Sequence, residues 1–271
     1  MINLIIGKNS NLSKRLSQKL DKHILISARD ILNNKELLNK YKNDTLNIIF
    51  NNFQPSTSLH HTSSYQEYIT NAILTTSIVL DTFNKTQINK IIYTSSSSVY
   101  GNNILCNEND ELKPLNLHAS LKVSNEKLIE EYCKKNNIDY TITRIFNMYG
   151  GDDKFSIISK IINACKNSTT IQLVNEGNAI RDFIHIDDVV SVYIQLLEIN
   201  NIPLLNVGTG VGSSLKNIIN YICSQGITID IKNIYKDELN TSTADINILN
   251  TINTHKTFWN IKNYLKKELN L

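Results

Sequence analysis

Short apolar segments alternate with longer amphipathic segments from the first residue of the chain. The apolar segments predict five strands, at residues 3–6, 23–26, 47–51, 90–94 and 140–145. Apolar residues recur at helical spacing between them, in the segments 12–20, 35–41, 65–83 and 119–135. Strands this apolar are buried on both faces, as they are in a parallel sheet covered by helices. The alternation therefore predicts a doubly wound α/β fold.

The pattern changes after Gly150 and Gly151. The later residues predict a helix at 155–164, short strands at 171–173 and 204–207, and helices at 215–223 and 264–269. This part is too small to be expected to fold alone. We therefore predict a first domain over 1–150 and a small C-terminal α/β cap over 151–271, parts of which return to the core of the first domain.

Composition narrows the class of protein. The chain has 271 residues with 28 Lys and Arg against 25 Asp and Glu, a net charge of +3. No basic stripe stands out along it, so nucleic acid and anionic membranes are not expected partners. No segment approaches the roughly 20 apolar residues that a membrane helix needs. The sequence predicts a globular, cytoplasmic protein.

The four cysteines stand at positions 106, 133, 165 and 223. They are too sparse for a disulfide framework and lack the short spacings of a metal-binding knuckle. We therefore predict a reducing environment and no bound metal.

The turn after the first strand is a candidate nucleotide site. A dinucleotide fingerprint would place glycines at positions 7, 10 and 13, where the chain has Gly7, Ser10 and Ser13. The serine hydroxyls and the amides at the helix start can still bind phosphate oxygens. The expected cofactor contacts here are Gly7, Asn9, Ser10, Asn11 and Leu12. A plain strand-to-helix turn, with Asn9 or Ser10 as the helix cap, remains an equal alternative.

Residues after the next two strands extend this candidate site. An acidic group about 20 residues after the glycine turn binds the adenosine ribose, whereas an arginine there can pair with a 2′-phosphate. Asp30 could also act simply as a helix cap. Ser27 and Arg29 favour NADP(H) over NAD(H). Asn52 and Phe53, after the third strand, are further expected cofactor contacts.

The strand predicted at 90–94 runs into a cluster of hydroxyl groups, Thr94 to Ser98, followed by Val-Tyr-Gly. With later segments, this stretch resembles the extended short-chain dehydrogenase/reductase family, in particular the enzymes that modify nucleotide-diphosphate sugars. The later segments that carry the resemblance are His118-Ala-Ser-Leu-Lys122, Arg144-Ile-Phe-Asn147-Met-Tyr-Gly150, Arg181-Asp-Phe-Ile-His-Ile-Asp187-Asp188, Asn206-Val-Gly-Thr-Gly210 and Ala244-Asp245. The resemblance implies a Rossmann-type domain over 1–150 and a mainly substrate-binding cap over 151–271.

The resemblance also implies three catalytic positions. Ser96 matches the family serine that holds the reacting sugar oxygen, and Lys122 matches the lysine that binds the nicotinamide ribose. The family tyrosine is replaced by His118, four residues before Lys122 and on the same helix face. A histidine can act as a general acid near neutral pH, although a neighbouring ammonium disfavours the imidazolium. The alternative is that the chemistry of this position has been lost.

Substrate contacts are implied at Ser97, Asn147, Arg181 and Lys236. A planar, permanently charged guanidinium suits the diphosphate oxygens at Arg181. A structural ion pair of Arg181 with Asp182 or Asp187 is the alternative, and for Lys236 a solvated lysine is at least as plausible as a phosphate contact.

Three reaction types occur in the family that the chain resembles. The 4,6-dehydratases carry an acidic pair where this chain has Ser97 and Ser98, which disfavours elimination. The short chain, its Gly-Lys first turn and the segment 151–155 favour a reductase of the 4-keto group of a nucleotide-diphospho-6-deoxysugar, of the paratose or abequose synthase type. A 4-epimerase, or a degenerate member that only binds a nucleotide or a partner, remain alternatives. The resemblance also implies a homodimer formed through the helices at 65–83 and 119–135.

Overall fold

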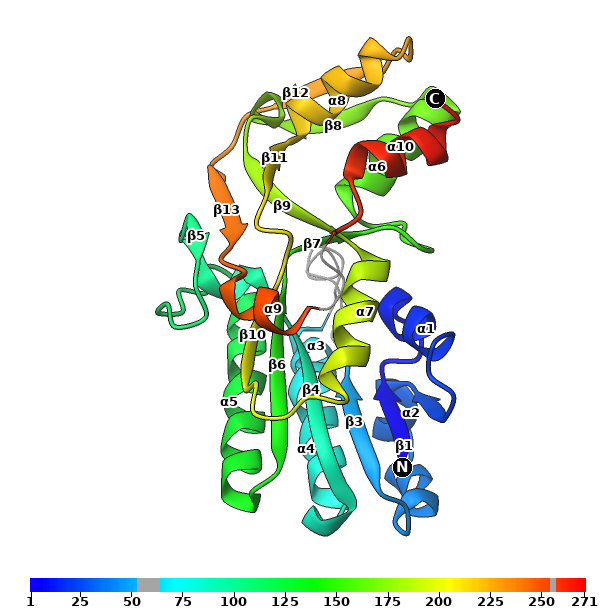
Figure 1. Ribbon diagram of the computed structural model, residues 1–271, viewed down its shortest axis with the longest axis vertical. Helices are drawn as coiled ribbons and strands as arrows, with labels where there is room; N and C mark the ends of the chain where they lie inside the picture. The colour runs from blue at the N-terminus through cyan, green and yellow to red at the C-terminus, as the bar shows by residue number, and fades with distance from the viewer. Residues whose placement is uncertain (53–63, 254–256) are drawn as a thin grey trace. The chain divides into compact units, whose positions relative to one another are not determined.

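The computed structural model describes residues 1–52, 64–253 and 257–271. The chain forms two compact units (Figure 1). Unit 1 comprises residues 1–99, 112–144 and 193–205, and unit 2 comprises residues 100–111, 145–192 and 206–271. The chain thus passes between the units several times.

Unit 1 is organised around a six-stranded sheet with the strand order β10-β6-β4-β3-β1-β2. Its strands are β1 (Ile2–Ile6), β2 (His23–Ile26), β3 (Leu46–Phe50), β4 (Ile88–Ser96), β6 (Asp139–Ile145) and β10 (Leu204–Val207). β1 pairs in parallel with β2 on one side and with β3 on the other, and β3 pairs in parallel with β4. The side chains of β3 are buried throughout, as the continuous apolar run predicts.

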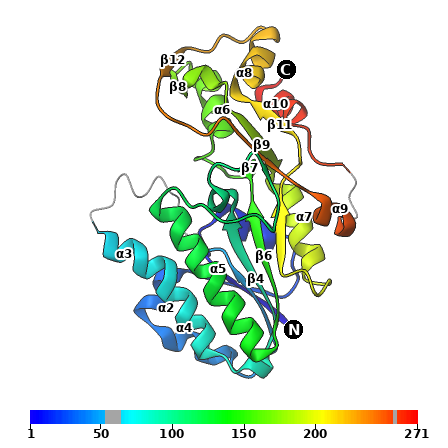
Figure 2. The same cartoon turned by 90° about the vertical axis from the view of Figure 1, so that its left-hand side faces the viewer.

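The helices of unit 1 cover this sheet. They are α1 (Asn11–Ser17), α2 (Ala28–Asn33), a 3₁₀ helix (Lys35–Tyr41), α3 (Tyr65–Ile69), a π-helical turn (Thr70–Leu74), α4 (Thr75–Thr82) and α5 (Leu117–Asn136). Figure 2 shows α4 and α5 side by side along the sheet. Asn116 caps α5 by accepting a hydrogen bond from the Ala119 amide, and Asn137 ends the helix in a left-handed conformation.

Unit 2 has shorter strands and its own core. Its main sheet has the order β11-β9-β13-β5, and β7 pairs with β9. A second sheet pairs β12 with β8 in parallel. The strands are β5 (Leu105–Cys106), β7 (Asn147–Tyr149), β8 (Ile171–Val174), β9 (Ile180–His185), β11 (Gly212–Ser214), β12 (Ile231–Ile234) and β13 (Thr241–Ala244).

The helices of unit 2 include α6 (Ile157–Asn167), α8 (Leu215–Ser224), α9 (Asn247–Ile252) and α10 (Ile261–Leu269). Apolar side chains of α6, α8 and α10 pack against β8 and β9 in one cluster. A further helix, α7 (Ile186–Leu196), begins in unit 2 and ends in unit 1.

The Rossmann-type α/β fold predicted from the sequence is confirmed by the parallel central sheet and its flanking helices. All five strands predicted in the first half are present, within two residues at each end. The prediction of one continuous helix over 65–83 was wrong in one respect, because a π-helical turn interrupts it at Thr70–Leu74. In unit 2 the sequence analysis missed β5, β7, β9, β11, β12 and β13, which are short and lack a continuous apolar run.

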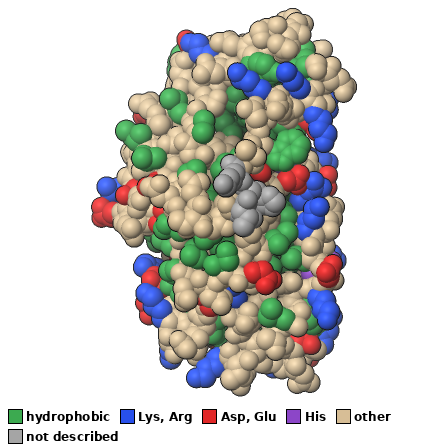
Figure 3. Space-filling view, viewed as in Figure 1, with side chains coloured by type: hydrophobic (Ala, Val, Ile, Leu, Met, Phe, Trp, Pro, Cys, Tyr) green, Lys and Arg blue, Asp and Glu red, His purple; other side chains and the backbone are tan. Residues whose placement is uncertain are grey.

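Charged side chains of both signs are interspersed on the face shown in Figure 3. This mixture agrees with the nearly balanced composition. In the part of the chain that the structure describes, no helix combines the length and the apolarity needed to span a bilayer.

Candidate active site

The candidate residues of unit 1 meet at one edge of its sheet. In the parallel register, Ile6 at the end of β1 lies beside Ile26 of β2 and Phe50 of β3. Phe50 in turn lies beside Tyr93 of β4. The turn after β1, the residues after β2 and β3, and the hydroxyl-rich end of β4 therefore lie along the carboxyl edge. In an open α/β sheet, this edge is where ligands bind.

Gly7 is required by close backbone packing at this edge. Its φ is +117°, and a Cβ atom added there would lie 2.1 Å from the backbone oxygen of Asn51. Only glycine accommodates both the positive φ and this contact. The first position of the fingerprint is therefore kept for a structural reason.

The serines at the two other fingerprint positions share one partner that the sequence analysis did not identify. The side-chain amide of Asn51 donates to Ser10 Oγ at 2.6 Å and to Ser13 Oγ at 2.9 Å. Ser10 is the N-cap residue of α1, but its side chain makes no capping hydrogen bond to the helix. Because Ser10 Oγ accepts the hydrogen bond from Asn51, its own hydroxyl proton can be donated to a phosphate oxygen. The turn thus fits a dinucleotide.

The residues after β2 form the start of α2. Ser27 is its N-cap and accepts a hydrogen bond from the Asp30 amide at 3.1 Å. The suggestion that Asp30 caps the helix was therefore wrong, because Asp30 lies inside the first turn. The side chains of Arg29 and Asp30 are both exposed. Asn52, after β3, donates to the Asn71 carbonyl, whereas Phe53 lies outside the described residues.

Lys122 is a buried basic residue of the candidate site. Its side chain on α5 is 5% exposed, and Nζ donates to the Thr94 carbonyl at the end of β4 at 2.6 Å. Burial lowers the pKa of Lys122 to about 7, against the opposing effect of the Glu126 carboxylate. The lysine is therefore anchored two residues before Ser96, whose hydroxyl accepts a hydrogen bond from the Ser98 amide at 3.2 Å.

His118 lies one turn before Lys122 on α5 and is partly buried. Its Nδ1 lies 2.8 Å from the hydroxyl oxygen of Tyr68, a residue of α3. Burial, and to a smaller extent the Lys122 ammonium, lowers the pKa of His118 to about 4. The position of His118 in the first turn of α5 disfavours the imidazolium in the same sense, because the amino end of a helix is positive. His118 is therefore a neutral imidazole near pH 7.

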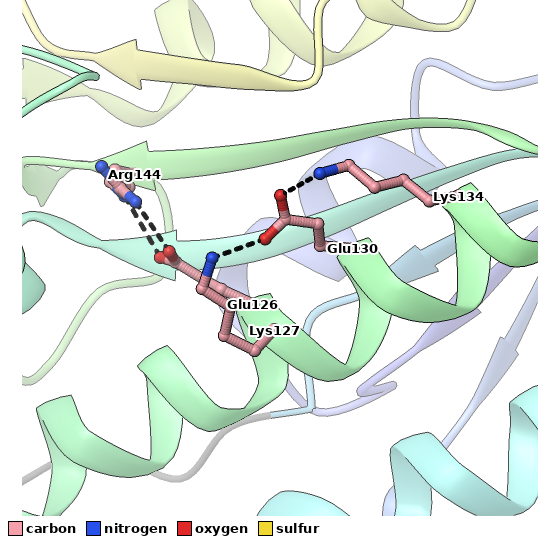
Figure 4. A network of polar contacts seen from close by, with 5 residues as sticks. All are labelled: Glu126, Lys127, Glu130, Lys134 and Arg144. Atoms are coloured by element: carbon pink, nitrogen blue, oxygen red, sulfur yellow. Dashed lines mark hydrogen bonds and ion pairs between the residues drawn. The ribbon is translucent and has the colours of Figure 1, made fainter.

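A buried ion pair supports the helix that carries these groups. Arg144 of β6 donates to Glu126 of α5 through Nη2 at 2.8 Å and through Nε at 3.3 Å, and the Ser95 hydroxyl also donates to this carboxylate. Figure 4 shows the pair, together with an exposed pair of lysines around Glu130 on the same helix. The Glu126–Arg144 pair fixes α5 against β4 and β6.

Three of the predicted substrate residues, Asn147, Arg181 and Lys236, belong to unit 2, whereas the fourth, Ser97, directly follows β4 in unit 1. Arg181 donates to the Ile180 carbonyl and forms an ion pair with Glu238, with Nη2 to Oε2 at 3.4 Å. The alternative prediction, an ion pair of Arg181 with Asp182 or Asp187, was wrong in its partners. Asp182 is instead buried and accepts hydrogen bonds from the amides of Thr209, Gly210 and Ala244.

Two further substrate candidates make backbone contacts in unit 2. Asn147 donates to the Asp182 carbonyl at 3.0 Å. Lys236 has an exposed side chain, and its backbone amide and carbonyl are both hydrogen-bonded to the side chain of Asn175. These hydrogen bonds within the protein do not show whether Asn147 and Lys236 bind substrate.

Sequence reasoning missed three contributors to the site: Tyr68, Asn51 and the Glu126–Arg144 pair. Tyr68 is 50 residues from His118, and nothing in the sequence connects the two. Asn51 ends an apolar strand and could have been suspected from that place alone. Glu126 could have been found as the next polar residue after His118 and Lys122 at a spacing of four.

Comparison with known proteins identifies relatives among nucleotide-sugar enzymes. The chain is 28% identical over 200 residues to a dTDP-D-glucose 4,6-dehydratase of Dictyostelium discoideum, covering 66% of this chain and 45% of the relative. It is 30% identical over 195 residues to an ADP-L-glycero-D-manno-heptose-6-epimerase of Brachyspira hyodysenteriae, covering 66% and 61%. The chain thus spans about half the length of these curated relatives.

Among solved structures, the UDP-glucuronic acid 4-epimerase of Bacillus cereus in complex with UDP-glucuronic acid and NAD has a TM-score of 0.85. The match covers 100% of this chain and 98% of that one at 20% identity, so it shows a shared fold. The family model described as the NAD dependent epimerase/dehydratase family matches residues 5–208, well over half of the chain. The protein belongs to the NAD dependent epimerase/dehydratase family.

Proposed function

We propose that the protein is a nucleotide-sugar 4-epimerase that uses a bound NAD(P) and has His118 in place of the usual catalytic tyrosine. The observation that carries this proposal is the placement of His118, which is partly buried on α5 one helical turn before Lys122. This burial, with the Lys122 charge, lowers the pKa of His118 to about 4 and favours the neutral imidazole. An epimerase begins with an alcohol and needs a group that accepts its proton. A neutral imidazole is such a group.

A bound nicotinamide would supply the hydride chemistry at the sugar carbon. His118 would accept the proton of the sugar hydroxyl and return it in the second half-reaction. Ser96 would hold the same oxygen by a hydrogen bond. Lys122 would bind the nicotinamide ribose, and the serine turn after β1 would bind the pyrophosphate. Relatives and solved structures named as 4-epimerases support the reaction type.

The 4-keto-6-deoxysugar reductase predicted from the sequence is the second candidate. The segment 151–155 and the Gly-Lys first turn favour it. Reduction of a ketone consumes a proton, which a histidine delivers as an imidazolium. That form is scarce near pH 7 in this site, so we place the reductase second.

The two candidates differ in their net redox change. UDP-, dTDP- and ADP-hexoses would be incubated with the purified protein, and the sugars followed by proton NMR. Interconversion of C4 epimers without net change in nicotinamide absorbance supports the epimerase, whereas stoichiometric NADPH consumption with 4-keto-6-deoxysugars supports the reductase. His118→Ala should lower either activity by roughly 10²- to 10⁴-fold, the usual contribution of a general acid or base. His23→Ala, which changes an exposed histidine at the opposite edge of the sheet, is the control. Full activity of the His118→Ala variant would refute both assignments.

We propose that the protein prefers NADP(H) to NAD(H), and Ser27 and Arg29 support this preference. Arg29 is exposed at the start of α2, within reach of solvent-borne phosphate, but Asp30 follows it. Titration of the protein with both nucleotides, before and after Arg29→Ala, tests this preference. Equal affinities in both proteins would contradict it.

We also propose a homodimer. Apolar side chains of Tyr65, Ile69 and Leu74 are exposed on α3 and the adjoining π-helical turn, beside the long helix α5 (Figure 2). The predicted four-helix contact would cover this surface. Sedimentation velocity of the protein and of an Ile69→Lys variant tests it, since a monomeric wild-type protein would contradict the proposal.

A further inference from the structure

Tyr68 makes a contact with His118 that the roles assigned above do not use. Its side chain is 2% exposed, and its hydroxyl oxygen lies 2.8 Å from His118 Nδ1. The ring packs in one cluster with Ala72 and Leu121, the latter on the same helix as His118. A phenol held this tightly stays in contact with the imidazole.

The backbone around Tyr68 is fixed to α5. A π-helical turn, Thr70–Leu74, follows α3, and the carbonyl of Ala72 within it accepts a hydrogen bond from Asn125 Nδ2 at 2.9 Å. Asn125 is fully buried and lies on α5, about two turns after His118. Turns of this kind are frequent at functional sites. The same helix thus positions both partners of the Tyr68–His118 contact.

We propose that Tyr68 is a positioning residue for His118, whose phenol oxygen accepts the Nδ1 proton and so leaves Nε2 to exchange a proton with the sugar; this proposal rests on the proposed function. A neutral imidazole carries one proton, and the nitrogen that holds it is set by the partner of the ring. When Nε2 takes up a proton, both nitrogens carry one. The Tyr68 contact persists through that change only if Nδ1 is the donor throughout.

The groups around the imidazole explain why such a partner is needed. From α5, the Lys122 ammonium disfavours the imidazolium, while Glu126 lies one turn beyond that lysine. From α3, Tyr68 faces Nδ1 as a neutral phenol, because burial raises its pKa to about 12. Its oxygen can therefore support the protonated ring without adding a charge.

The test is a Tyr68→Phe variant, which removes the hydroxyl and keeps the ring. Nitrogen NMR of histidine-labelled protein reports which ring nitrogen of His118 is protonated, independently of turnover. We expect the Nδ1-protonated form in the wild-type protein and a shift towards the Nε2-protonated form in the variant. The epimerase kcat should fall by about 10- to 100-fold, the effect of a lost hydrogen bond to a charged group. KM should change little.

Tyr132→Phe is the matched control, because Tyr132 is a half-buried tyrosine of α5 that donates to the Leu80 carbonyl, away from His118. In a His118→Ala background, Tyr68→Phe should have no further effect on kcat, since the residue acts through His118. A folded Tyr68→Phe variant with an unchanged His118 tautomer would overturn the proposal. If no nucleotide sugar is turned over, the proposed function fails, but the tautomer measurement still decides the role of Tyr68.

Discussion

The pH dependence of turnover distinguishes the two proton-transfer roles open to His118. Its pKa of about 4 means that, at pH 7, about one molecule in a thousand carries the imidazolium. With an unperturbed histidine, about a quarter of the molecules would carry it. A reaction that requires the imidazolium would therefore lose about tenfold in rate for each pH unit above 4, whereas one that requires the neutral ring would be constant.

The measurement is kcat/KM from pH 5 to pH 8, because this parameter reports the ionisation of the free enzyme. We expect no tenfold loss per pH unit in this range, as the epimerase assignment requires. Lys122, whose pKa is about 7, is the group of the site that changes charge within it. The His118→Tyr variant is the informative comparison, because a phenol beside the Lys122 ammonium should lose its proton in the accessible range and introduce a rise with pH.

A tenfold fall per pH unit in the wild-type protein would refute the reasoning, since it would show that the protonated ring is the working form. A titration of the His118 imidazole near pH 6.5, followed by NMR so that it is distinguished from Lys122, would refute it in a different way. It would mean that His118 titrates as an exposed histidine and that its burial beside Lys122 has no electrostatic effect.

The remaining predictions concern the groups around the site. Glu126→Gln should lower the free energy of unfolding by about 3 kcal/mol, because it leaves the buried Arg144 without its counter-ion. Glu130→Gln removes the partner of two exposed lysines and should lower it by less than about 1 kcal/mol. Urea unfolding measures both changes. Burial lowers the pKa of Lys122 from 10.5 to about 7, so between these pH values the unfolded chain binds a proton that the folded chain does not. The free energy of unfolding should therefore rise with pH across that window. Urea midpoints of the wild-type protein should show this rise, and those of Lys122→Met should lack it. Arg181→Lys should weaken UDP binding about tenfold, as measured by calorimetry, because a lysine cannot bind a diphosphate through two parallel hydrogen bonds. Glu238→Gln should strengthen binding, because the Glu238 carboxylate would compete with the diphosphate for the guanidinium. An unchanged affinity in both variants would remove Arg181 from the binding site.

The sheet of unit 1 could be predicted from the sequence because each strand is a continuous apolar run. Phe50 and the residues before it in β3 are fully buried, and such a run has few alternative structures. β9 was missed because Arg181, Asp182 and His185 interrupt its apolar pattern. Its stability comes from pairing with β7, β11 and β13, which are distant in sequence. Contacts of that kind leave no local signal.

The candidate site was predicted where spacing along one element determines proximity. His118 and Lys122 are four residues apart on a helix, so the sequence predicts their shared face. Asn51 and Tyr68 contact the site through the fold. The hydrogen bonds from Asn51 to Ser10 and Ser13 exist because β1 and β3 are neighbours in the sheet, and that pairing cannot be derived from the turn itself.

The buried lysine has opposite consequences for a tyrosine and for a histidine at position 118. A phenol becomes negative when it loses its proton, so a neighbouring ammonium stabilises its reactive form. An imidazole becomes positive when it gains a proton, so the same ammonium destabilises that form. The replacement therefore turns a favourable pair of opposite charges into an unfavourable pair of like charges, and the site can retain both residues only if one stays neutral for most of the cycle. A neutral partner on the far side of the ring, such as the Tyr68 phenol, then becomes the means by which His118 tolerates brief protonation.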